Sequence, residues 1–244
     1  MTTEERLVKV AENREKIYEA GENAGKQAEH DTFWDAFQKN GARTDYTSAF
    51  AGTWWTGETF RPKYDIKPTN AGNMFYQNTT LNVDLVDLLN ECGVTFDTSN
   101  CTSATNMFAV TYIKHVGEIN LTKLTSIALV FFRAWGLVTI DKFIINETGT
   151  VTFTSAFDSC SLLQNIVIEG KIGRNISFSS ATNLTVESMK SIILHLVDYA
   201  GTTSASTYSV KFNAQALARL KAEGATSPSG GLWTDYIEEL GWTY

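Results

Sequence analysis

A repeated phrase constrains the fold more than any other feature of this chain. The letters Thr-Ser-Ala-Phe stand at 47–50 and again at 154–157, and Asn-Met-Phe stands at 73–75 and again at 106–108. The anchors of the repeat are Phe50, Phe75, Phe108, Phe132 and Phe157, separated by 25, 33, 24 and 25 residues. The longest interval contains "DLVDLLNEC", whose leucines have helical spacing. A short helix inserted there leaves a period of about 24 residues, which indicates a stack of similar units.

Each unit also carries a short apolar–polar alternation that is typical of a strand: "GVTFDT", "GEINLT", "DKFIIN" and "QNIVIE". A unit of this length cannot bury its own apolar face, so neighbouring units must share one core. The small polar residues before each Phe would turn the chain while bonding to backbone groups. The sequence therefore predicts an α+β fold, a leucine-rich-repeat-like solenoid of about five degenerate turns of about 24 residues, with an N-terminal helix and an α/β C-terminal cap.

Three regions follow from this pattern. Residues 1–41 are predicted to be a helix, which is either a stalk or a cap on the first turn. Val10, Ile17 and Ala24 recur every seven residues, as in a coiled-coil seam. That seam predicts a homo-oligomer, with a trimer as one form. Residues 42–180 are predicted to be the solenoid, and 181–244 an atypical terminal unit of helices and one strand that covers the last layer.

Charge and hydropathy exclude several partners. The net charge is −7 and the pI is near 5.0, which argues against binding to nucleic acid or anionic lipid. The longest apolar run, "SIALVFFRAWGLVTI", is too short to span a bilayer and is interrupted by Arg133, so no membrane insertion is predicted. The N-terminus has no apolar signal-peptide core. We expect either that the protein does not use that export route or that a leader has been removed.

No catalytic constellation is visible. The histidines, His30, His115 and His195, are far apart, and the sequence has no zinc-protease, hydrolase or phosphate-loop motif. Its three cysteines form no CxxC pair and are predicted to be small buried residues. The carboxylates Asp84, Asp87 and Glu91 share one helix face that is more typical of solvated charge than of a glycosidase pair. We expect no enzyme, cofactor or metal site, and keep a glycan hydrolase or depolymerase as a third alternative.

One unit resembles a known family. The stretch "TSAFDSCSLLQNIVIEG" is similar to the BspA-type leucine-rich repeat, with matching residues Ala156, Phe157, Cys160, Leu163, Ile166 and Ile168. The units at Phe108 and Phe132 lack the cysteine, and the resemblance covers about residues 45–180. The flanking stretches at 16–52 and 184–201 resemble segments that accompany such repeats in predicted phage and prophage structural proteins of gut Gram-positive bacteria.

That resemblance implies a non-enzymatic structural or binding (adhesion) module, associated with a phage virion or its tail fibre. The alternative is a BspA-like adhesin on the bacterial cell surface. In either case the expected partner is a protein or a cell-surface glycan.

The alternation in the strands predicts where a partner would bind. If Ile119, Phe143 and Ile166 point inward, one outward column contains Thr95, Asn120, Ile144 and Val167, and a second contains Asp97, Thr122, Asn146 and Glu169. The aliphatic pair Ile144 and Val167 should then be covered by a partner or another part of the chain. The loop residues Trp54, Trp55 and Tyr64 are further binding candidates. The alternative that we favour is that these aromatics pack beneath the N-terminal helix.

Overall fold

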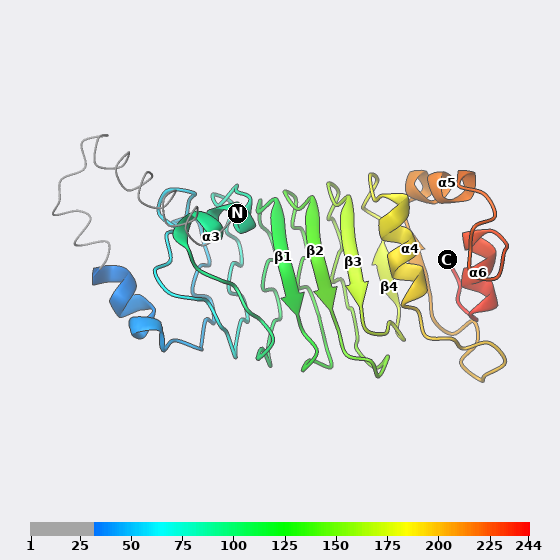
Figure 1. The fold of residues 1–244 in the computed structure, drawn as a ribbon, viewed down its shortest axis with the longest axis horizontal. Coiled ribbons are helices and arrows are strands. Elements are labelled where there is room, and N and C mark those ends of the chain that lie inside the picture. Colours follow the sequence, from blue (N-terminus) through cyan, green and yellow to red (C-terminus); the bar gives the residue numbers. More distant parts are fainter. Residues whose placement is uncertain (1–31) are drawn as a thin grey trace.

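The computed structural model describes residues 32–244. Most of the predicted N-terminal helix, with the seam of Val10, Ile17 and Ala24, lies outside the described residues. The described chain is elongated, with its strands side by side across the long axis (Figure 1). Its elements, after helical residues 32–37, are η1 (Lys39–Gly41), α3 (Leu85–Cys92), β1 (His115–Asn120), β2 (Thr139–Ile144), β3 (Asn165–Glu169), β4 (Ile176–Phe178), α4 (Val186–Leu194), β5 (Val210–Phe212), α5 (Ala214–Ala222) and α6 (Trp233–Glu239).

Two small parallel sheets form the β structure. One contains β1, β2 and β3 in that order, and the other contains β4 and β5. Elsewhere in the described residues, neighbouring segments pair only through isolated parallel bridges, such as Asp45 with Asn70 and Ser126 with Thr152. No described helix is long and apolar enough to cross a membrane.

The predicted leucine-rich-repeat-like solenoid of about five degenerate turns is therefore wrong, although the α+β class is right. Regular strands run through only three consecutive units, and the second sheet has two strands of three residues each. Between residues 42 and 114 the structure has isolated bridges and α3 instead of strands. One physical reason lies beside the bridge of Ile66 with Phe96: Pro68 has no backbone N–H to extend a ladder.

The phenylalanines form one continuous row of ring contacts through the core. Consecutive centroids lie between 4.7 and 6.2 Å apart, in the order Phe50, Phe75, Phe108, Phe131, Phe157, Phe178 and Phe212. The predicted anchor Phe132 is wrong. Phe131 occupies the row and is fully buried, whereas Phe132 is half-buried beneath the guanidinium of Arg133. Spacing alone could not choose between two adjacent phenylalanines, because the intervals differ by a single residue.

Tight turns carry each Phe into this row. The residue two positions before it has a positive φ of 49–57°; these residues are Ser48, Asn73, Asn106, Leu129 and Ser155. Asn and other short polar residues tolerate this left-handed conformation best, and Leu129 is the one apolar residue among the five. The amides of the first four of these phenylalanines, Phe50, Phe75, Phe108 and Phe131, then donate to a carbonyl of the following unit, as Phe75 does to Met107 at 2.8 Å. Backbone hydrogen bonds between units therefore persist where no regular strand forms.

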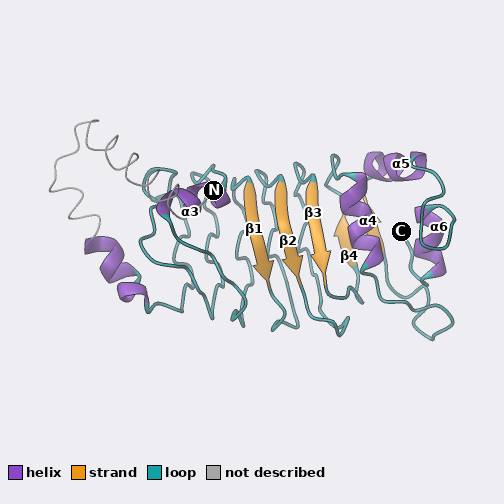
Figure 2. Cartoon of the chain, in the orientation of Figure 1, coloured by secondary structure: helices purple, strands orange, loops and turns teal. Residues whose placement is uncertain are grey.

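Helices cover both edges of the three-stranded sheet (Figure 2). At one edge Asp84 caps α3 by accepting from the Asp87 amide, and Asp84 also pairs with His115 of β1. At the other edge, the Ile166 amide donates to Ser188 Oγ and the Ile168 amide donates to Ser191 Oγ, each at 2.9 Å. Serine hydroxyls on α4 thus take the place of a further strand at the β3 edge, which protects that edge from pairing with another chain.

The elements α4, β5, α5 and α6 lie within residues 181–244, where the sequence predicted a terminal unit of helices and one strand. Asn213 caps α5 by accepting from the Gln215 amide, and α6 packs Trp233 and Ile237 into the core. Helix α4 ends at Leu194, and its C-terminal cap is His195. Strand β4 lies before the predicted boundary at residue 180 and pairs with β5 beyond it. The second sheet therefore joins the central part of the chain to its C-terminal part.

Candidate functional site

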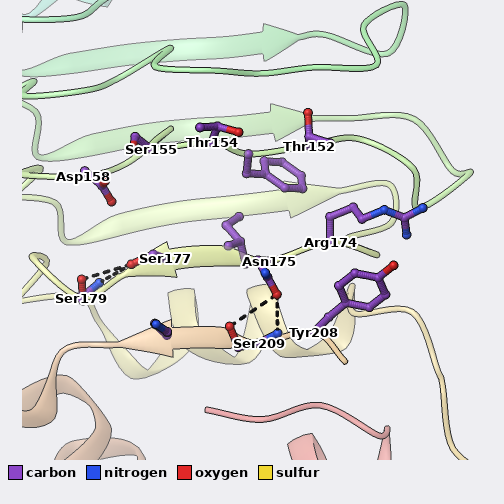
Figure 3. A pocket seen from close by; sticks show the side chains of 13 residues that line it. Thr152, Thr154, Ser155, Asp158, Arg174, Asn175, Ser177, Ser179, Tyr208 and Ser209 are labelled. Carbon is purple, nitrogen blue, oxygen red and sulfur yellow. Dashed lines mark hydrogen bonds between the residues drawn. The ribbon is translucent and has the colours of Figure 1, made fainter. Parts of the chain in front are cut away.

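A polar groove of about 580 Å³ opens on the face where the turn of residues 152–158 approaches the second sheet (Figure 3). We call it the β4–β5 groove. Its lining residues are Thr152, Phe153, Thr154, Ser155, Asp158, Arg174, Asn175, Ile176, Ser177, Ser179, Tyr208, Ser209 and Lys211. Most of these side chains end in a hydroxyl or an amide. The groove therefore offers hydrogen bonds rather than an apolar pocket.

Close backbone packing sets the position of Arg174 at one end of the groove. A Cβ atom on the preceding residue, Gly173, would overlap the carbonyl oxygen of Gly149, so only glycine fits there. Arg174 Nη1 donates to the Gly173 carbonyl at 2.7 Å and lies 3.4 Å from the Tyr199 hydroxyl. The guanidinium carbon lies 5.0 Å from the ring centroid of Tyr208. These contacts hold the cation in place before any ligand arrives.

The floor of the groove is fixed by hydrogen bonds between its two strands. The Ser209 amide donates to Asn175 Oδ1 at 2.8 Å, next to the ladder that joins Ile176 to Val210. The hydroxyls of Ser177 and Ser179 lie 3.1 Å apart on the same strand side (Figure 3). A row of hydroxyls at strand spacing, beside an aromatic ring and a guanidinium, can hydrogen-bond and stack on a polar ligand such as a sugar.

The sequence analysis missed this groove, although part of its signal was present. In "NISFS" the buried Ile176 and Phe178 alternate with outward Asn175, Ser177 and Ser179. Similar polar–apolar alternation occurs in "TFT" at 152–154 and in "SVKF" at 209–212. The sequence could not show that these stretches share one groove, because β4 and β5 are separated by α4 and a long loop.

The predicted outward column across the first sheet is wrong in its stacking. Asn120 does lie beside Ile144, but the neighbour of Ile144 on β3 is Glu169, not Val167. The cause is an irregularity: Ile140 pairs with Ile166 and Phe143 with Ile168, so β2 has an extra residue there. Val167 is 49% exposed and Ile144 is half-buried, and the two do not form the predicted apolar pair.

The other predicted members of these columns have local partners. The Thr95 amide donates to the Asp65 carboxylate, and the Asn120 amide donates to the Thr98 hydroxyl. Asn146 donates its side-chain amide to the Leu124 carbonyl. Glu169, predicted in the second column, instead lies beside Ile144 of the first column, so the two columns do not stack as predicted.

Paired charges occupy the outer face of β1–β3 instead. Lys142 lies between Glu118 at 3.9 Å and Glu169 at 3.1 Å. His115 lies between Asp84, 2.9 Å from Nδ1, and Asp141, 2.8 Å from Nε2. Burial lowers the pKa of His115, but the hydrogen bonds to the two carboxylates outweigh it and leave the pKa raised. Both ring nitrogens are occupied, so this histidine links three elements rather than serving as a free base.

The predicted loop aromatics divide into two groups. Trp55 is only 6% exposed and packs 5.3 Å from Trp34, and the Tyr64 hydroxyl donates to Asp35. These two residues pack against helical residues 32–37, as the favoured alternative predicted. Trp54 differs: it is 63% exposed and stacks on Trp55 at 5.7 Å.

Sites for metal or thiol chemistry are not found in residues 32–244. No group of three His, Cys, Asp or Glu side chains there could hold a metal ion. The three cysteines are free, and burial raises the pKa of Cys160 to about 12, so its thiol stays protonated. The β4–β5 groove is thus the candidate that combines a hollow with a polar lining. The chain matches no protein-family model, no curated protein and no solved structure.

Proposed function

We propose that this protein is a non-enzymatic binding (adhesion) module that holds a glycan in the β4–β5 groove. The observation that carries the proposal is the row of Ser and Thr hydroxyls that ends at Tyr208 and Arg174. Sugars present hydroxyl groups on their rims and C–H groups on their faces. Hydroxyl partners and an aromatic ring complement these two features.

The size and charge of the groove support this ligand class. Its volume of about 580 Å³ falls within the range typical of small-ligand sites. Two of its side chains are cationic, which is few for a nucleic-acid backbone, and the whole chain carries a net charge of −7. A polar ligand of a few sugar units fits both properties.

The structural context supports a role in attachment. The elongated body carries the groove near its C-terminal end, and both edges of its main sheet are covered (Figure 1). The resemblance of residues 154–170 and of the two flanking stretches favours a place on a phage particle or its tail. There the N-terminal segment would make the protein oligomeric, and the groove would face a cell-surface glycan.

A glycan array tests the binding proposal. We expect the purified protein to bind a subset of glycans and Tyr208→Ala to abolish that binding, because the variant removes the aromatic face beside Arg174. The matched control is Tyr112→Ala, which removes a partly exposed tyrosine that packs on Trp135 outside the groove. Melting curves of all three proteins show whether each is folded. Binding that survives Tyr208→Ala would contradict the proposed site.

Immunoelectron microscopy tests the proposed location. Antibody against the protein should label phage particles released from the producing cells. Labelling of the bacterial surface without particles would favour the adhesin alternative. Labelling confined to the cytosol would contradict both locations.

A further inference from the structure

We infer that the β4–β5 groove selects an acidic glycan, whose carboxylate or phosphate group binds Arg174 while its hydroxyls bind the Ser/Thr row. This inference rests on the proposed function and names the ligand class of the same site. A guanidinium can give two parallel N–H donors to a carboxylate or phosphate. It is thus the group on the groove wall best suited to recognise an acid.

The two cations of the groove have no carboxylate partner within residues 32–244, unlike the cations that form ion pairs elsewhere in the described chain. Lysines 63, 67, 142 and 190 each lie within 3.2 Å of an Asp or Glu oxygen. Within residues 32–244, neither Arg174 nor Lys211 forms such an ion pair. Both line the groove, and the partners of Arg174 are a carbonyl, a hydroxyl and a ring. An acidic group of a ligand would supply the missing counter-charge.

The groove also carries different groups at its two sides, and its second cation, Lys211, is the ladder partner of Ser177. Arg174 and Tyr208 lie at one side of the groove, and Asp158 and Ser155 lie at the other (Figure 3). A carboxylate accepts hydrogen bonds from sugar hydroxyls, so the Asp158 end suits the neutral part of a ligand. A small inorganic anion would use only the Arg174 end. A ligand that carries both an acid and hydroxyls would use the whole groove.

The binding of three polymers to the intact protein tests this inference. The probes are polygalacturonate, which carries carboxylates, polyglycerol phosphate, which carries phosphates, and dextran, which is neutral. We expect at least one acidic polymer to bind more tightly than dextran by about tenfold or more, as one charge-assisted hydrogen bond allows. The acidic polymer that binds better shows whether the groove prefers a carboxylate or a phosphate.

Two arginine variants make the test specific. Arg174→Gln should weaken binding to the acidic polymer by about tenfold to hundredfold, because glutamine keeps hydrogen bonding but loses the charge. The matched control is Arg133→Gln, whose guanidinium also lies 5.0 Å from an aromatic ring but outside the groove. That control should bind like the unchanged protein. If Arg174→Gln fails to fold, Lys211→Gln, which alters an exposed lysine of the groove, decides the question.

Four results would overturn the inference, and they separate it from the proposed function. Equal affinity for dextran and both acidic polymers, or an unchanged affinity in both groove variants, refutes acid selection but leaves glycan binding intact. Glycan-array binding restricted to neutral sugars would likewise refute acid selection and leave glycan binding intact. Failure to bind any polymer or any arrayed glycan refutes the proposed function as well.

Discussion

The outer face of β1–β3 and the β4–β5 groove are both polar strand surfaces, but they use their charges differently. On the first, Lys142 and His115 each lie between two carboxylates of neighbouring elements. In the second, Arg174 and Lys211 have no carboxylate partner within the described residues. The contrast teaches that charge on a strand face indicates a binding surface only where the fold leaves it unpaired.

The largest effect is expected in the core that both regions share. Phe131→Ala should lower the free energy of unfolding by about 3–5 kcal/mol, because a fully buried ring leaves a cavity in the Phe row. Phe132→Ala, one residue away and half-buried, should cost about 1 kcal/mol. Chemical denaturation of the two variants measures the difference. Equal losses would show that the rings of the row do not share one continuous core.

A smaller loss is expected at the covered edge of β3. The double variant Ser188→Ala with Ser191→Ala removes the hydroxyls that accept from the amides of Ile166 and Ile168. Each buried amide left without a partner should cost about 1–3 kcal/mol. Ser204→Ala, on a loop, is the control for serine removal. A double variant as stable as the control would mean that water can bond to these two amides in place of the serine hydroxyls.

The paired face should also show a pH dependence of stability. The folded pKa of His115 is raised above its unfolded value near 6.5. The contacts of His115 with Asp84 and Asp141 therefore stabilise the folded state fully below that pH. Their contribution is lost as the pH rises through the folded pKa. Because the group is partly exposed, we expect less than about 1 kcal/mol. The measurement is the stability difference between the unchanged protein and His115→Gln at pH 5.5 and pH 8.5, and a difference that grows with pH would contradict the link.

The smallest effect compares two lysines on the two surfaces. Lys142→Gln breaks exposed ion pairs to Glu118 and Glu169 and should cost about 0.2–1 kcal/mol of stability without changing glycan binding. Lys211→Gln should leave stability unchanged and weaken binding. Melting curves and polymer binding of both variants test this crossed pattern. Reversed results would assign the binding role to the β1–β3 face.

Local patterns in the sequence predicted what depends on near neighbours. The inward alternation around Ile119 and Phe143 is where the sequence placed it. The sequence could not predict the extra residue between Ile140 and Phe143, because strand register depends on both partners. It could not choose Phe131 over Phe132 either, because the two spacings differ by a single residue.

The candidate site was harder to predict than the fold. Its strands pair residues that are 34 positions apart, such as Ile176 with Val210, and no motif marks that contact. The binding residues predicted from strand alternation were sought on the β1–β3 face, where Glu169 is already paired with Lys142. Pairing between distant charges is a tertiary property, so composition and periodicity could not reveal which polar surface stays free.

Hydrogen–deuterium exchange with and without polygalacturonate, or polyglycerol phosphate if that polymer binds better, tests the central claim most directly. The account predicts that bound polymer slows exchange in residues 152–158, 174–179 and 208–211, which line the groove. Exchange in 115–120 and 139–144, on the β1–β3 face, should not change. Protection confined to the β1–β3 face, with the groove unaffected, would contradict the account.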